Sequence, residues 1–386
     1  MTRHSKADYF PMSLRFAWAN AFQSRRRVQV AIASIACSIL LVFLQLGFFL
    51  TARRAHTLLY ELLDFDLTLT SDRFESLKNT GAFPVGRLYQ VRALDGVADV
   101  ARLNVDWADW LNPLTAQKSS LMLIGIDLNP SFIRDQRISE QMEALRPTGT
   151  LLVDNLSSSS YGSLASGSRA GIRSKSVRIV GQFSMGTDFK AAGRAIVNQG
   201  TYYSVKRENG DAVCLGLIKL KPGADLTRVK TALRASLPPD VLLFDRQSLI
   251  TDEEDYYTIV KPIGFFFQAG WILAFIVGAV VLFQTLATDI TWRFREFATL
   301  KAIGMRSSFL YASGMFQAGI YGLLAYLPAL VVASVLFYTI QAVTSLPMQM
   351  SFSLAVFVLG LSLFMCILSG VLALIRVRRA DPASLL

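Results

Sequence analysis

Cysteine and histidine are scarce in this sequence, which has three cysteines and two histidines among 386 residues. Cys37 and Cys366 lie inside apolar runs, and Cys214 lies in a predicted strand. The spacings that build a disulfide framework or bind zinc are missing. The composition therefore excludes the disulfide-stapled class, and we expect no metal bound by this chain.

The motifs of common catalytic sites are also missing. The sequence contains no G-x-x-x-x-G-K-[ST] loop for nucleotide phosphates, no H-E-x-x-H zinc motif and no G-x-S-x-G nucleophile motif. We therefore predict no catalytic residues, no cofactor bound by this chain and no enzymatic activity. An enzyme with its active site in the polar part of the chain is the least favoured function.

Charge is almost absent from four long apolar runs, residues 28–51, 263–288, 309–340 and 352–375. Each exceeds the roughly 20 residues that a membrane-spanning helix needs. Ion-coupled carriers usually place ionisable side chains at mid-membrane, so this pattern argues against a proton relay or a channel. The first run is too long for a cleaved signal peptide, whose apolar region has about 7–15 residues.

The third run would measure about 48 Å as a helix, more than the roughly 30 Å hydrocarbon core. It must therefore tilt, bend or protrude, and Pro328 offers a place for a kink.

The net charge of +11 is concentrated beside the apolar runs. Residues 1–27, 287–308 and 376–386 hold thirteen Lys or Arg against four acidic residues, whereas the link 341–351 has no charge. Short basic segments remain in the cytoplasm. We therefore expect both termini inside, contacts with membrane lipids, no nucleic-acid partner, and the polar block between the first two runs on the outer side.

That polar block combines strand and helix signals. Strand-like runs occur at residues 66–70, 120–128, 176–185 and 213–221, and residues 226–237 form a helical pattern that ends at Pro238. The block is expected to fold as a mixed α/β domain. Trp107 and Trp110 are expected in its core, and a sugar or lipid site at these residues is the less favoured alternative. Residues 157–168 are interpreted as a flexible Ser/Gly loop, and DEEDYYTIVK (252–261) as a charged helix that runs into the second span.

Residues 293–305, RFREFATLKAIGM, form a short charged segment between the second and third runs. Phe294, Phe297, Ala298 and Met305 share one face at helical spacing, and Gly304 stands where a helix would stop. The pattern is typical of a short helix along the membrane that a partner protein could grip. A solvated connecting loop, or burial of the apolar face in lipid, explains it as well.

The predicted fold class is a membrane protein with four transmembrane α-helices and a large mixed α/β extracytoplasmic domain inserted between the first and second spans. The expected boundaries are a cytoplasmic or interfacial helix at 1–27, spans at 28–52, 261–288, 308–340 and 352–376, the domain at 53–260, a cytoplasmic helix at 289–307, a periplasmic link at 341–351 and a cytoplasmic tail at 377–386.

Several motifs resemble the MacB/FtsX-type permeases of ABC transporters, most closely the DevC-type, heterocyst glycolipid exporter-like subgroup. They are SLRFAWANAFQSRRR (13–27), IGIDLNPS (124–131), GQFSMGTDFKAAGRAIVN (181–198), LGLIKLKPGADL (215–226), KPIGFFF (261–267), FQTLATDI (283–290), REFATLKAIGM (295–305) and RRADPASLL (378–386). The subgroup usually has Thr where this chain has Lys261.

The resemblance implies a homodimeric permease subunit of an ATP-driven exporter in the bacterial inner membrane. ATP and Mg would bind a separate cytoplasmic ABC ATPase. That ATPase would contact a coupling helix formed by Arg295, Glu296, Phe297, Ala298, Thr299, Leu300, Lys301, Ala302 and Gly304. It also implies a HlyD-like periplasmic adaptor and a TolC-like outer-membrane channel. An FtsX-like permease that activates an extracytoplasmic hydrolase, and a lipoprotein-releasing permease, share this plan and remain alternatives.

Overall fold

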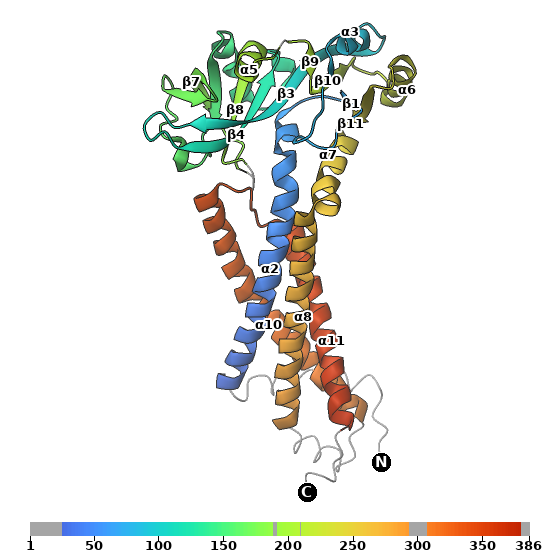
Figure 1. Cartoon of the computed structure of the whole chain (residues 1–386). Helices are drawn as coiled ribbons and strands as arrows, with labels where there is room; N and C mark the ends of the chain where they lie inside the picture. The colour runs from blue at the N-terminus through green and yellow to red at the C-terminus, as the bar shows by residue number, and fades with distance from the viewer. Residues whose placement is uncertain (1–24, 188–190, 209, 293–306, 380–386) are drawn as a thin grey trace. The chain divides into compact units, whose positions relative to one another are not determined.

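The computed structural model describes residues 25–187, 191–208, 210–292 and 307–379 (Figure 1). The chain divides into two compact units. The first, called the helical unit, comprises the described residues up to Phe49 together with Phe266–Thr339 and the chain from Met348. The second, called the domain, comprises Leu50–Phe265 and Ile340–Pro347.

Four long helices supply the helical unit: α2 (Arg25–Leu62), α8 (Pro262–Trp292), α10 (Ser307–Thr344) and α11 (Phe352–Arg379). Among the described residues, each carries a stretch long and apolar enough to cross a membrane, at Val28–Leu62, Gly264–Thr285, Met315–Thr344 and Phe352–Leu372. The four predicted spans are therefore confirmed as apolar helices, and the chain is a multi-pass membrane protein.

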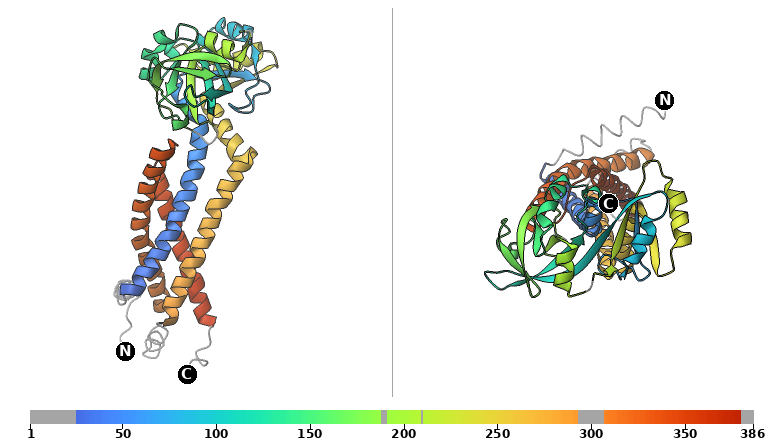
Figure 2. Two further views of the ribbon diagram at one scale, coloured as in Figure 1. Left: turned by 60° about the vertical axis from the view of Figure 1, so that its left-hand side comes forward. Right: turned by 90° about the horizontal axis from the view of Figure 1, so that it is seen from above.

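Small residues let these helices approach closely, and Figure 2 shows them running lengthwise beside one another. A Cβ added to Gly47 would lie 2.3 Å from the ring of Phe337, and one added to Gly322 would lie 2.3 Å from Cys366 Sγ. Ser369 donates a hydrogen bond of 2.8 Å to the Ala279 carbonyl. Close backbone approach and interhelical hydrogen bonds are the usual means by which helices associate in lipid.

The domain contains a mixed sheet with helices at its margins (Figure 1). Its main strands are β1 (Leu67–Ser71), β3 (Val97–Leu111), β4 (Lys118–Ile126), β5 (Thr150–Asp154), β6 (Arg169–Ile172), β7 (Lys175–Phe183), β8 (Gly193–Asn198), β10 (Leu215–Leu220) and β11 (Val241–Asp245). The pair β2 (Phe83–Pro84) and β9 (Ala212–Val213) forms a small second sheet.

The helices of the domain are α3 (Gly86–Arg92), α4 (Gln136–Glu140), α5 (Gln199–Lys206), α6 (Leu226–Ser236) and α7 (Arg246–Asp255). A π-helical turn, η4 (Tyr256–Val260), follows α7. Three 3-10 turns lie at Pro130–Phe132, Met142–Leu145 and Ser159–Tyr161.

Strand pairing gives the sheet an open end and a closed end. Within the described residues its order is β11-β1-β10-β3-β4-β8-β5-β7-β6. The pairs β4–β8 and β5–β7 are parallel, and the other pairs are antiparallel. β6 also pairs with the second half of β3, where Trp110 faces Ile172, so the strands from β3 to β6 close into a ring. β11 is left at the open edge. The predicted mixed α/β domain between the first two apolar helices is confirmed.

Three apolar clusters fill the domain. One, which includes Trp110 and Tyr161, is built from the strands of the closed ring together with α5. A second lies where β11, β1, β10 and β3 meet α3 and α6. The third joins the sheet to the end of α2 and to α7 through residues such as Tyr60 and Leu249. Trp110 is fully buried and Trp107 is half-buried, which confirms their predicted place in the core.

Two sequence interpretations are corrected here. The predicted continuous helix into the second span is wrong, because Lys261 has extended backbone (φ −91°, ψ 144°) between η4 and α8. The next residue is Pro262, and a proline disfavours the α conformation at the residue before it. The Ser/Gly segment 157–168 is anchored rather than free: Tyr161 is fully buried, and its hydroxyl donates to the Ser120 carbonyl at 2.6 Å.

Helix ends also differ from the expected span boundaries. α2 continues ten residues past the expected boundary at 52, α8 continues into the segment expected as the cytoplasmic helix from 289, and α10 continues to Thr344, into the expected link. A helix can leave the hydrocarbon while its backbone hydrogen bonds continue, so the apolar run in the sequence marks the span and not the end of the helix.

Asp245 supplies a test of how the open edge of the sheet is stabilised. Its carboxylate forms an ion pair with Lys230 of α6 and accepts the Ser248 N–H at 2.8 Å as the N-cap of α7. The hydrogen bond with Lys230 and the one from Ser248 lower the pKa of Asp245 to about 2. Because the unfolded value is about 3.9, this contribution is complete above pH ~4 and is lost as pH falls through about 2.

We therefore expect Asp245→Asn to be less stable than the wild type at pH 7, and the difference to shrink towards zero near pH 2. Urea unfolding at a series of pH values, followed by circular dichroism, measures it. Lys230→Gln should make the unfolding free energy depend less on pH over the same range. An unchanged pH dependence in that variant would contradict the stabilising role of the Lys230–Asp245 pair.

Candidate functional site

The residues predicted to contact an ATPase lie outside the described residues. Arg295, Glu296, Phe297, Ala298, Thr299, Leu300, Lys301, Ala302 and Gly304 all fall within 293–306. The expected N-terminal helix at 1–27 is described only from Arg25, and the tail only to Arg379. These assignments therefore remain predictions.

The best-built polar site among the described residues is a part of the domain that we call the base. It consists of the end of α2 from Leu50, the helix α7, the turn η4 and the chain Lys261–Phe265, which leads into α8. A loop after β1, residues 74–80, packs against these segments. All of them belong to the domain, and they include the two connections through which α2 and α8 are continuous with it.

Glu253 of α7 joins three segments of the base through one carboxylate. The side chain is 1% exposed. Both of its oxygens lie 3.0 Å from the Leu77 backbone nitrogen, and Tyr60 of α2 donates its hydroxyl to Oε2 at 3.2 Å. A buried carboxylate is tolerated only where hydrogen bonds replace water, so α2, α7 and the loop must keep their mutual positions.

Arginines reinforce the same joint. Arg246, the first residue of α7, donates to the Tyr60 carbonyl at 2.8 Å and lies over the ring of Phe65. That carbonyl is in the last turn of α2, where the helix leaves its acceptors unpaired and favours a cation. Arg194 of β8, 1% exposed, donates to the Ala55 carbonyl of α2 at 3.3 Å.

A half-exposed ion pair lies beside Glu253. Arg53 of α2 contacts Glu254 of α7 at 2.5 Å, with 35% and 25% of the two side chains exposed. The sequence placed Arg53 and Arg54 on the outer side of the membrane, against the usual distribution of positive charge. In the structure both have carboxylate partners, since Arg54 pairs with Glu61 at 3.2 Å.

Aromatic contacts hold the π-helical turn. Tyr257 stacks on His56 of α2, with ring centroids 3.5 Å apart, and Tyr256 donates its hydroxyl to Glu75 at 3.1 Å. The ammonium of Lys261 lies 4.8 Å from the centroid of the Tyr256 ring, and its hydrogen bond with Tyr256 raises the pKa of Lys261. His56 is half-buried, and one of its faces is covered by the π-helical turn.

The break at Lys261 brings the chain so close to itself at position 264 that only glycine fits there. A Cβ at this position would lie 2.1 Å from the Thr258 carbonyl oxygen. The first turn of α8 thus lies directly against the last turn of η4, with room only for a hydrogen atom. π-helical turns occur often at functional sites, and this one directly precedes the KPIGF motif of the sequence.

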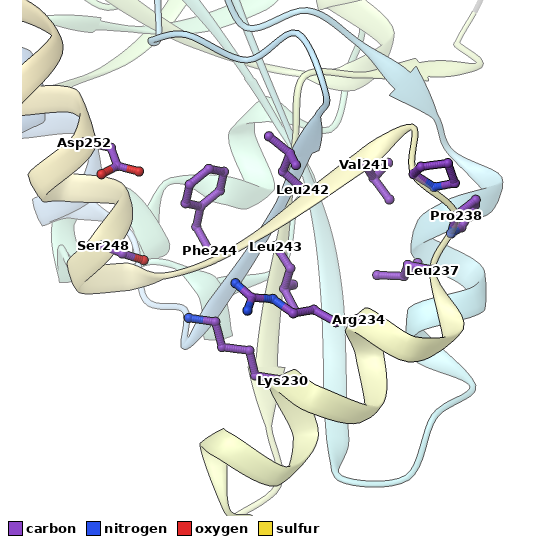
Figure 3. A pocket seen from close by; sticks show the side chains of 11 residues that line it. Lys230, Arg234, Leu237, Pro238, Val241, Leu242, Leu243, Phe244, Ser248 and Asp252 are labelled. Atoms are coloured by element: carbon purple, nitrogen blue, oxygen red, sulfur yellow. The ribbon is translucent and has the colours of Figure 1, made fainter.

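A groove of about 660 Å³ lies between α6 and α7, at the open edge of the sheet (Figure 3). Lys230 and Arg234 of α6 form one wall, and Ser248 and Asp252 of α7 form the other. Its floor is apolar and includes Leu237, Pro238, Leu242 and Phe244. An open strand edge beside apolar side chains suits an extended peptide chemically. No group of three metal-ligating side chains occurs among the described residues.

Glu253→Ala tests the central role of that carboxylate. The substitution leaves the Leu77 N–H and the Tyr60 hydroxyl buried without this acceptor, at a cost of roughly 1–3 kcal/mol for each group. We expect the unfolding free energy to fall by about 2–4 kcal/mol. Thermal or denaturant unfolding of the full chain in mild detergent, followed by near-ultraviolet circular dichroism, measures the change.

The neighbouring Glu254→Ala is the matched control. It removes the half-exposed pair with Arg53, for which we expect a loss below about 1 kcal/mol. Equal losses of unfolding free energy in the two variants would show that the buried Glu253 carboxylate stabilises the protein no more than the half-exposed pair does.

Comparison with known proteins identifies part of the chain. Residues 269–382 match the family model described as FtsX-like permease C-terminal. No protein of curated function matches.

Among solved structures, the chain is similar to the periplasmic region of MacB from Actinobacillus actinomycetemcomitans, with 10% identity and a TM-score of 0.35 over 50% of this chain and 94% of that one. It is also similar to the extracellular domain of the noncanonic ABC-type transporter YknZ from Gram-positive bacteria, with 11% identity and a TM-score of 0.33 over 47% and 98%.

The matched region begins within α8, includes α10 and ends just past α11, three of the four apolar helices. Over residues 269–382 the chain therefore carries an FtsX-like permease C-terminal domain.

Proposed function

We propose that this chain is the membrane subunit of an ATP-driven ABC exporter of the MacB/FtsX type. The observation that carries the proposal is the FtsX-like permease match over residues 269–382, in a chain with four apolar helices and a large α/β domain between the first two. The finer assignment to the DevC-type subgroup rests on the sequence motifs alone.

The expected partners follow from this plan. The chain acts as a homodimer in the bacterial inner membrane, with its termini in the cytoplasm and the domain in the periplasm. A separate cytoplasmic ABC ATPase binds ATP and Mg and contacts the segment Arg295–Gly304. A HlyD-like adaptor and a TolC-like channel complete the path through the outer membrane.

In this proposal the helices of the chain transmit movement to the domain, and cargo does not pass through a pore between them. α2 runs without a break from Arg25 to Leu62, and its last turns are fixed to α7 and the sheet by Tyr60, Arg246 and Arg194. The connection through α8 is different, since it bends at Lys261. α2 is thus suited to carry a displacement into the domain, and Lys261 is suited to absorb a change of angle.

The scarcity of charge in the apolar helices supports the same mechanism. The most apolar window of each candidate span has at most two charged residues. A carrier that moves a polar solute through its helices needs polar groups there to replace water. Cargo that is taken up and expelled on the outer side makes no such demand.

The double substitution Phe297→Asp with Leu300→Asp tests whether the predicted coupling helix contacts the ATPase. Both side chains fall in the predicted coupling helix, and a buried charge at a protein interface costs several kcal/mol when it is unpaired. We expect the double variant to lose the co-purifying ATPase and its stimulated ATP hydrolysis, while the chain still enters the membrane. The measurement is affinity purification of the tagged chain from native membranes, with mass spectrometry and an ATPase assay.

Thr231→Ala in α6 is the control, because that residue lies in the domain and outside the predicted contact segment. Retention of the ATPase by the Phe297/Leu300 variant would overturn the coupling-helix assignment. The absence of any ATPase from the wild-type preparation would overturn the proposed function itself. Co-purification of a cell-wall hydrolase without an adaptor would replace export by regulation.

A further inference from the structure

Thr187 attaches the link between α10 and α11 to the rest of the domain. Thr187, which is 6% exposed, follows the strand β7 after a short loop. Its backbone N–H donates to the Ser345 carbonyl at 3.1 Å, and its hydroxyl donates to the Thr344 carbonyl at 2.8 Å. Both acceptors belong to Ile340–Pro347, the part of the link that lies within the domain.

These carbonyls come from the C-terminal end of α10, where helical backbone acceptors lack partners within the helix. Thr187 satisfies two consecutive ones. Ser345 adopts the left-handed conformation, with φ of 56°, and its N–H donates to the Gln341 carbonyl at 2.9 Å. A residue other than glycine pays a conformational cost in this region, so contacts that hold it there are needed.

The other side of the contact is also built to hold its shape. Asp154 at the end of β5 is completely buried, and its carboxylate accepts the N–H groups of Met185 at 3.2 Å and Gly186 at 2.8 Å. Burial raises the pKa of Asp154, and these N–H groups offset part of that effect. The loop before Thr187 is therefore fixed from inside the domain.

Gly186 allows the close approach. Its φ is 96°, and a Cβ at this position would lie 3.1 Å from the Ser345 carbonyl oxygen. The loop thus contributes a buried anchor, Asp154, and a glycine that permits close contact. The link contributes the carbonyls at the end of α10 and the left-handed Ser345.

We propose that Asp154, Gly186 and Thr187 form a latch that holds the end of α10 on the domain. The latch gives the domain a third attachment to the apolar helices, besides α2 and the chain through Lys261. Under the proposed function, on which this role rests, opening of the latch would release α10 and α11 from movements of the domain. The latch itself does not depend on any partner.

Hydrogen–deuterium exchange of the purified full chain in mild detergent tests the latch without an ATPase. Thr187→Val keeps the shape and the backbone N–H but removes the hydroxyl donor. We expect exchange to rise about fivefold in peptides that cover 184–187 and 341–348, the effect of one lost hydrogen bond. Gly186→Ala, which also blocks the approach, should raise it further.

Thr231→Val is the matched control, because the Thr231 hydroxyl donates to the Thr227 carbonyl within α6, away from the latch. It should leave exchange at 184–187 and 341–348 unchanged. Unchanged exchange at 341–348 in both latch variants would overturn the latch. That outcome would leave the proposed function standing, whereas the absence of any ATPase from the wild-type preparation would overturn the proposed function and leave the latch standing.

Discussion

The buried carboxylate of Glu253 is the constraint on which the base of the domain depends. Glu253 belongs to α7, and its carboxylate accepts hydrogen bonds from Tyr60 in the last turns of α2 and from Leu77 in the loop after β1. A carboxylate removed from water is costly unless its hydrogen bonds are satisfied. The positions of these segments are therefore coupled, because none can move away without removing a hydrogen bond from the buried carboxylate.

The neighbouring contacts give the α2 and α8 connections different stiffness. α2 ends in turns whose carbonyls are held by Arg246 and Arg194, and its aromatic and ionic partners lie on α7 and η4. The chain after η4 instead turns through extended backbone at Lys261 and passes Gly264, which lies against Thr258. The α2 connection is continuous helix and the α8 connection is a bend with tight steric limits, a combination that fits the transmission role proposed above.

The latch at Thr187 resembles the contact of Arg246 with the end of α2. In each case a helix end presents backbone carbonyls that need donors, and the domain provides them from a well-anchored side chain or loop. Arg246 serves α2, and Thr187 serves α10. The anchors are buried acids in both regions, Glu253 at the base and Asp154 behind the latch, because a carboxylate can accept several N–H or O–H groups at once.

The sequence by itself determined the four apolar helices, the mixed domain between the first two, the strands β1, β4, β7 and β10 and the burial of Trp110, because hydrophobic runs and alternation are local signals. It also predicted the coupling segment 293–305, which lies beyond the described residues. It did not reveal that His56 stacks on Tyr257, that Tyr161 anchors the Ser/Gly segment, or that the helix breaks at Lys261, although Pro262 was a signal for the last.

Tertiary structure alone decided the Glu253 network and the Thr187 latch. Both join residues more than 150 positions apart in the chain, and no local pattern encodes such a contact. The buried acids Glu253 and Asp154 read as ordinary charged residues in the sequence, because their burial depends on elements that only the folded chain brings together.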